Sequence, residues 1–129
     1  MIGSSRDLKF LYISSVDISI GNGPGVNERE FIIGMHALLG NSIKFVIPKP
    51  SETLHDEKFP FSSCIFAPTF KRGQKLRYLP HVVSQLLLAR KLLKKEDFAL
   101  IIYRLAALPL VPFALARMFR DVPYAIKTF

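Results

Sequence analysis

The glycine-rich loop near the amino terminus is the part of this sequence whose residue types best suit ligand binding. Residues 14–27 follow the apolar run Lys9 to Ser14 and include Gly21-Asn22-Gly23-Pro24-Gly25-Val26-Asn27. Glycines let backbone approach a ligand closely, and the amino terminus of a helix attracts anions through its free N–H groups and dipole. The loop therefore suits a phosphate or a sugar hydroxyl, or else it is a flexible, turn-forming connection.

Three familiar glycine-loop classes do not fit this loop. The dinucleotide pattern G-x-G-x-x-G fails because Val26 takes its last glycine position, and no acidic residue closes the next strand at Ile47-Pro48. The loop lacks the Gly-Lys-Ser/Thr ending of nucleotide triphosphatases. A phospho-receiver domain would need an Asp after the third strand, where Phe66-Ala67-Pro68 stands.

A helix should follow the loop. Asn27 can cap it, Glu30 lies three residues on as in a capping box, and Gly40 supplies the stop. Its predicted apolar positions are Phe31, Ile32, Met35, Leu38 and Leu39. Glu28 and Glu30 could be read as a catalytic pair, but acids in a first helical turn favour the dipole, so we interpret both as structural.

The rest of the chain alternates between strand and helix patterns. Strands are predicted at 9–14, 42–48, 61–67, 99–103 and 124–129. A second helix is predicted over 79–95, and a third has Pro109 and Pro112 in its first turn. The second helix should bury Leu79, Val82, Val83, Leu86, Leu87 and Leu93 and turn Gln85 elsewhere. This order predicts one α/β domain over residues 1–129 with a doubly wound, mostly parallel sheet in three αβα layers, incomplete at the carboxyl end.

Two segments together resemble a known family. Ser14-Ser15, followed by Gly23-Pro24-Gly25-Val26-Asn27-Glu28-Arg29-Glu30-Phe31, is similar to the amino-terminal domain of glycosyltransferase family 4. Asp97-Phe98-Ala99-Leu100-Ile101-Ile102-Tyr103-Arg104, with Leu108-Pro109-Leu110, looks like the fourth strand of that family and the loop after it. The resemblance covers nearly the whole chain, although this half of the family varies widely.

The resemblance implies a GT-B fold, in which two Rossmann-like domains face a cleft and only the acceptor-side domain is present here. The full enzyme would move a hexose, with retention, from a sugar nucleotide to a glycan or a lipid-linked acceptor. The nucleotide sugar is a substrate held mainly by the absent donor-binding domain, no cofactor is implied, and this domain alone should be inactive. Gly23, Gly25 and Asn27 would lie beside the donor phosphates and the acceptor.

Arg104 ends a nearly continuous apolar strand and is the remaining candidate for substrate binding. A guanidinium at the end of a central strand can bind phosphate in a forked geometry. The alternative is that Arg104 forms an ion pair with Asp97 or Asp121.

The net charge of +8 comes from one region. Residues 58–95 contain nine of the eighteen Lys and Arg residues and none of the ten Asp and Glu residues. Lys71, Arg72, Lys75 and Arg77, with the basic end of the second predicted helix, could bind an anionic membrane surface, or they are simply solvated. Nucleic acid is not expected, because the aromatic residues fall on core strands.

The remaining residues limit other kinds of site. The single Cys64 lies among apolar neighbours, and His36, His55 and His81 form no ligand-spaced cluster with it, so we expect no metal site. No signal-peptide pattern opens the chain, and the apolar stretch 98–119 contains Arg104, Arg117 and two prolines. We expect a cytoplasmic protein, either free or peripheral at the inner face of the membrane. The alternative function is a non-catalytic Rossmann-like module that binds an anionic membrane surface or a protein partner.

Overall fold

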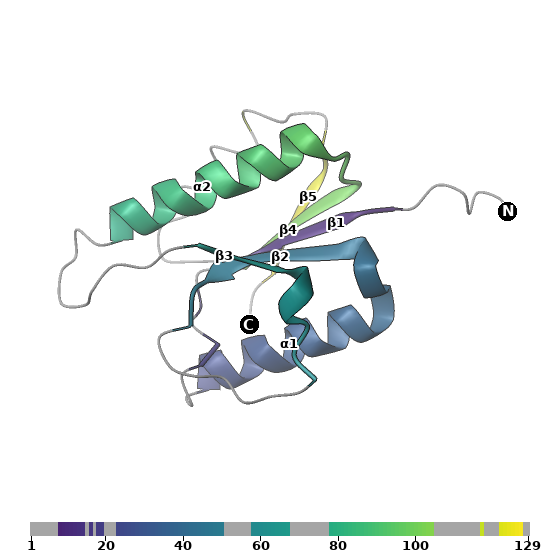
Figure 1. The fold of residues 1–129 in the computed structure, drawn as a ribbon, viewed down its shortest axis with the longest axis vertical. Helices are drawn as coiled ribbons and strands as arrows, with labels where there is room; N and C mark the ends of the chain where they lie inside the picture. The colour runs from purple at the N-terminus through teal and green to yellow at the C-terminus, as the bar shows by residue number, and fades with distance from the viewer. Residues whose placement is uncertain are drawn as a thin grey trace, which may run out of the picture.

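A five-stranded parallel sheet forms the centre of the molecule. The computed structural model describes residues 8–14, 16, 18–19, 23–50, 58–67, 78–104, 117 and 122–127. Within them the strand order is β3-β2-β1-β4-β5. The strands are β1 (Phe10–Ile13), β2 (Ile43–Pro48), β3 (Cys64–Ala67), β4 (Leu100–Arg104) and β5 (Tyr124–Lys127). The described helices α1 (Gly23–Leu39) and α2 (Tyr78–Lys95) lie on opposite faces of the sheet (Figure 1).

The direction in which the chain crosses the sheet reverses at β1. From β1 the chain passes through α1 to β2 and on to β3 at one edge, and then returns through α2 to β4 on the other side of β1. All four described strand pairs are parallel. This topology confirms the predicted α/β, Rossmann-like, doubly wound fold. In such sheets ligands bind beyond the carboxyl ends of the strands at the point of reversal, here β1 and β4.

The core is divided between the two faces of the sheet. Alternate side chains of β1 point to opposite faces, so Leu11 and Ile13 pack toward α2 while Tyr12 packs toward α1. Both sets are buried. The interior strands are therefore continuous runs of apolar residues and do not alternate between apolar and polar residues. Each fully buried branched side chain contributes on the order of 2 kcal/mol through the apolar area removed from water.

The beginning of α1 differs from the sequence prediction. The helix begins at Gly23, so the predicted capping box of Asn27 and Glu30 is wrong. Asn27 and Glu30 are exposed residues inside the helix. Pro24 lies in the first turn, where its missing N–H leaves no helical hydrogen bond unmade. The helix ends as predicted, because Gly40 adopts a left-handed φ of 58° and leads into the short 3₁₀ turn Gly40–Ser42.

The buried face of α2 also differs from the prediction. Val83 and Leu87 are exposed, whereas Gln85 is 1% exposed and Ala89 is buried beside Leu93. Gln85 Nε2 donates a hydrogen bond to the carbonyl oxygen of Ser14, which compensates for burying its amide. The helix is therefore rotated about its own axis, compared with the orientation that would bury the predicted apolar face.

The remaining elements follow the prediction with bounds that differ by one to a few residues. Residues Phe61–Ser63 form a 3₁₀ turn, so the third strand begins only at Cys64. The last strand, β5, lies at an edge of the sheet, paired with β4. Of the predicted helix that contains Pro109 and Pro112, only Arg117 lies among the described residues.

Candidate functional site

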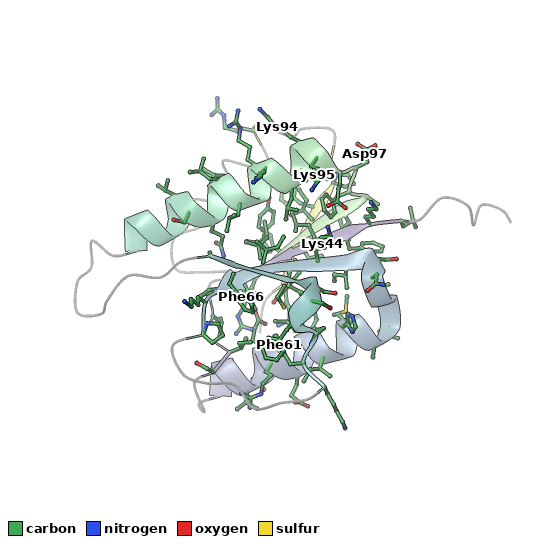
Figure 2. All side chains as sticks on the ribbon, in the orientation of Figure 1. Lys44, Phe61, Phe66, Lys94, Lys95 and Asp97 are labelled. Carbon is green, nitrogen blue, oxygen red and sulfur yellow. The ribbon has the colours of Figure 1, made fainter. Side chains whose placement is uncertain are left out.

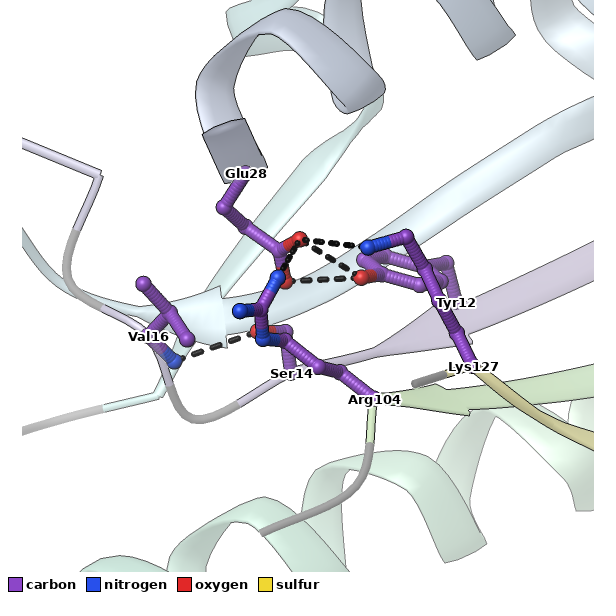
Figure 3. Close-up of polar contacts among 6 residues, drawn as sticks. All are labelled: Tyr12, Ser14, Val16, Glu28, Arg104 and Lys127. Carbon is purple, nitrogen blue, oxygen red and sulfur yellow. Dashed lines mark hydrogen bonds and ion pairs between the residues drawn. The ribbon is translucent and has the colours of Figure 1, made fainter. Parts of the chain in front are cut away.

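The candidate site lies at the carboxyl ends of β1 and β4. Ser14 is the first residue after β1, and its N–H donates to the carbonyl oxygen of Val46 at 3.0 Å, which extends the sheet pairing by one residue. Arg104 is the last residue of β4. The first turns of α1 lie above this end of the sheet, so residues from three elements converge there (Figure 3).

A buried glutamate holds these elements together. Glu28, in the second turn of α1, has no exposed surface. The Tyr12 hydroxyl lies 2.7 Å from both Glu28 carboxylate oxygens and donates to them, and Arg104 Nη1 donates to Oε1 at 2.9 Å (Figure 3). The side chain of Arg104 is only 3% exposed. Removing one partner of such a buried pair typically costs about 3–5 kcal/mol, because the other charge is left uncompensated.

Lys127 adds a second cation to this cluster from β5. Its Nζ lies 3.9 Å from Glu28 Oε1 and 4.6 Å from the centre of the Phe31 ring. Burial, together with the adjacent Glu28 carboxylate, raises the pKa of Tyr12 well above that of an ordinary phenol. Tyr12 therefore remains a hydrogen-bond donor throughout the physiological pH range.

The cluster is suited to positioning rather than to acid–base catalysis. Glu28 lies out of contact with solvent, and its carboxylate already accepts bonds from a phenol and a guanidinium. The cluster joins α1 to β1 and β4, and thereby fixes the start of α1 over the carboxyl ends of these strands. A structural role for Glu28 fits this geometry, but the predicted reason was wrong, because the first turn of α1 contains no acidic residue. Tyr12 and Arg104 hold Glu28 instead, and Glu30 is exposed and lies outside the cluster.

The glycines predicted to bind substrate lie in the first turn of α1. Gly23 is exposed, and a Cβ at this position would meet nothing within 4 Å, whereas Gly25 is buried. Asn27 is exposed one turn further on. The described part of the preceding loop packs against the domain, because Ile18 is fully buried and its carbonyl oxygen accepts a 2.8 Å bond from Arg29 Nη1. Among the described residues, none lies close enough to Gly23 to meet a side chain placed there.

Arg104 lies at the predicted end of β4, with an ion-pair partner that the sequence did not indicate. Its described partner is Glu28 rather than Asp97, which is exposed at the amino end of the same strand. Asp121 lies outside the described residues. Whether Arg104 also contacts a substrate stays a prediction, and any such contact must coexist with its bond to Glu28.

Sequence reasoning missed a second set of polar groups on the α2 face. Ser14 is 1% exposed, its Oγ accepts a bond from the N–H of Val16 at 3.1 Å, and its carbonyl accepts the Gln85 amide at 2.5 Å. Tyr103 is 1% exposed, and its hydroxyl has no hydrogen-bond partner among the described residues. The only sequence signal for this set is a glutamine within an otherwise apolar helical stretch.

The other predicted sites lie partly outside the described residues. This is so for the predicted membrane-surface residues Lys71, Arg72, Lys75 and Arg77. Within the described ranges, no three His, Cys, Asp or Glu side chains are grouped so that they could hold a metal ion. Cys64 is half-buried, its thiol donates to the carbonyl oxygen of Pro60 at 3.4 Å, and burial raises its pKa to about 12.

Comparison of the chain with protein-family models, curated proteins and solved structures finds no match. Neither described helix is long and apolar enough to cross a membrane. Function must therefore be argued from the fold and the geometry of the site.

Proposed function

We propose that this chain is the acceptor-side domain of a glycosyltransferase that moves a hexose from a sugar nucleotide to a glycan or a lipid-linked acceptor. The observation that carries the proposal is the position of the Gly23-Pro24-Gly25 turn. It opens α1 after β1, at the point where the chain reverses direction across the sheet. Helix amino termini at such points are suited to phosphate groups because backbone N–H groups and the helix dipole point toward the ligand.

The buried cluster supports this proposal by fixing the helix. Glu28 lies one turn beyond Gly25 and is bonded to both central strands through Tyr12 and Arg104. A phosphate site made of backbone amides needs such rigidity, since its donors must be aimed before the ligand arrives. In the proposed enzyme Gly23, Gly25 and Asn27 face the donor diphosphate and the acceptor, and Arg104 keeps α1 in place.

Nucleotide binding tests the site directly. We expect UDP, GDP or ADP at millimolar concentration to shift the amide resonance of Gly23 when the ¹⁵N-labelled chain is titrated, since most contacts to the nucleotide would lie in the donor-binding domain. Gly23→Ala should weaken binding by about tenfold or more, because the added methyl occupies the open space through which the diphosphate approaches. Gly34→Ala is the matched control, since this glycine lies in the same helix and a Cβ there would also meet nothing within 4 Å. Equal binding by the two variants, or no shift with any nucleotide, would contradict the site.

Turnover tests the enzyme class. The proposal requires a donor-binding domain in addition to this one. The protein that includes it should release nucleoside diphosphate from at least one member of a panel of sugar nucleotides. If that protein releases nucleoside diphosphate from no member of the panel, the non-catalytic module is favoured instead.

A further inference from the structure

The outer face of α2 carries two apolar side chains followed by a group of cations. Val83 and Leu87 are 49% and 56% exposed. Arg90, Lys91, Lys94 and Lys95 are also exposed. Positions 83, 87, 90 and 94 follow the spacing i, i+4, i+7 and i+11, which places them on one stripe of the helix. This stripe faces away from the sheet, because Gln85, Ala89 and Leu93 on the opposite side are buried.

The positive charge of this stripe is reinforced by its surroundings. Figure 2 shows Lys94, Lys95 and Asp97 gathered at the end of α2 that lies near the amino ends of the strands. The carboxylate of Glu96 is already engaged by Lys9 at 3.1 Å and by Lys44 at 2.6 Å, and it is 14% exposed. Glu96 therefore does little to neutralise the lysines of α2, and Asp97 is the exposed acid beside them.

We propose that the outer face of α2, from Val83 to Lys95, binds the surface of an anionic lipid bilayer. Half-exposed aliphatic side chains next to several cations are the combination by which helices lie in a membrane interface. The long lysine side chains can keep their ammonium groups at the level of the headgroups while Val83 and Leu87 enter the acyl boundary. Each cation near an anionic surface strengthens binding by about fivefold.

Lipid fits this face better than nucleic acid does. The described exposed side chains of α2 carry no aromatic ring, and single-stranded nucleic acids bind mainly by stacking their bases on such rings. The apolar pair Val83 and Leu87 would also gain nothing against a phosphate backbone. Binding to an acidic polymer would depend on the cations alone. A substitution of the apolar residues should therefore weaken binding to lipid but not binding to nucleic acid.

This interaction does not depend on the proposed glycosyl transfer. The cationic end of α2 lies near the amino ends of the strands, whereas Gly23 and Arg104 lie at their carboxyl ends. Substitutions in the α2 stripe should therefore leave nucleotide binding unchanged, and substitutions at Gly23 should leave membrane binding unchanged. Failure of one proposal would not remove the other.

Vesicle sedimentation with matched variants tests the proposal. We expect the chain to sediment with vesicles of phosphatidylcholine and phosphatidylglycerol at low salt, to sediment little with phosphatidylcholine alone, and to be released by about 0.5 M NaCl. Lys91→Gln/Lys94→Gln should lower the partition coefficient by about tenfold or more. Lys49→Glu is its control, because it changes net charge equally at an exposed position outside α2.

A second pair of variants tests the apolar part. Leu87→Gln should lower the partition coefficient roughly threefold or more. Leu38→Gln, at an 80% exposed leucine of α1 on the opposite face of the sheet, should not. The proposal fails if the chain does not bind anionic vesicles, or if each control weakens binding as much as its partner variant. It also fails if the chain binds heparin or an oligonucleotide in preference to vesicles and Leu87→Gln has no effect. Circular dichroism melting should confirm that all four variants are folded.

Discussion

Two buried tyrosines occupy neighbouring strands in very different polar surroundings. The Tyr12 hydroxyl donates to both oxygens of the Glu28 carboxylate at 2.7 Å. The Tyr103 hydroxyl is buried without a hydrogen-bond partner among the described residues. A hydrogen bond to a charged group contributes about 1.5–3 kcal/mol, whereas an unsatisfied buried hydroxyl costs about 1–3 kcal/mol. The same chemical change should therefore have opposite effects at the two positions.

We predict that Tyr12→Phe destabilises the domain by about 2 kcal/mol and that Tyr103→Phe leaves it unchanged or stabilises it by about 1 kcal/mol. Both substitutions remove one oxygen and keep the ring, so packing against the neighbouring aromatic side chains is preserved. Urea denaturation of the two variants beside the wild type gives both free energies of unfolding. Equal destabilisation by the two variants would show that the two hydroxyls have equivalent environments.

The sequence was informative about single residues at the site and uninformative about their partners. Arg104 could be selected because a charged side chain ends a buried strand. Its partner Glu28 could not, because the two are 76 positions apart and meet only when β4 pairs with β1 beneath α1. Pairings of this kind depend on sheet order, which hydrophobic patterns do not specify.

At the scale of elements, hydrophobic spacing located the helices but not the details of their ends and faces. The capping-box pattern placed the start of α1 after Asn27, yet the helix begins at Gly23, because proline is accommodated in a first turn. The buried face of α2 was also misplaced, because the hydrogen bond from Gln85 to the Ser14 carbonyl favours burying an amide there. In the first case the proline in the first turn, and in the second the hydrogen bond of Gln85, outweighed the pattern of capping and apolar residues on which the prediction rested.

Gly34 and Gly40 provide a test of the local structure of α1. Gly34 lies on the exposed side of the helix with a normal φ and open space around it, so Gly34→Ala should stabilise the domain by about 1 kcal/mol. Gly40 has a φ of 58°, so Gly40→Ala should destabilise it by about 1 kcal/mol although space is equally open there. Thermal melting should move the midpoints in opposite directions. A shift of the same sign for both would contradict the assigned end of α1.

At the scale of the whole molecule, ionic contacts connect both ends of the sheet. At the carboxyl end Glu28 joins α1 to the central strands. At the amino end Glu96, just after α2, joins this helix to the beginning of β1 through Lys9 and to β2 through Lys44. The two contacts differ in solvent access, since Glu28 is fully buried whereas Lys9 and Lys44 are 42% and 36% exposed. Only the contact at the amino end should respond strongly to salt.

Acid titration should reveal the contribution of Glu96. Its hydrogen bond from Lys44 is the main cause that lowers its pKa below the ordinary value of about 4.3, with Lys9 adding to the effect. A carboxyl whose pKa is lower in the folded state stabilises that state above its unfolded pKa, and this stabilisation is lost as the pH falls through the folded pKa. Glu96→Gln should therefore destabilise the domain at pH 7, by at most about 1 kcal/mol because both lysines are solvent accessible.

The difference between wild type and Glu96→Gln should shrink as the pH falls below about 4.3, and it should also shrink in about 0.5 M NaCl at pH 7. Glu30→Gln is the control, because it removes the same charge from an exposed position of α1 for which the described residues provide no ion pair. Urea denaturation of the three proteins between pH 3 and pH 7 gives the comparison. If the stability difference for Glu96→Gln stays constant over this range, the carboxylate of Glu96 does not join α2 to the amino end of the sheet through its charge.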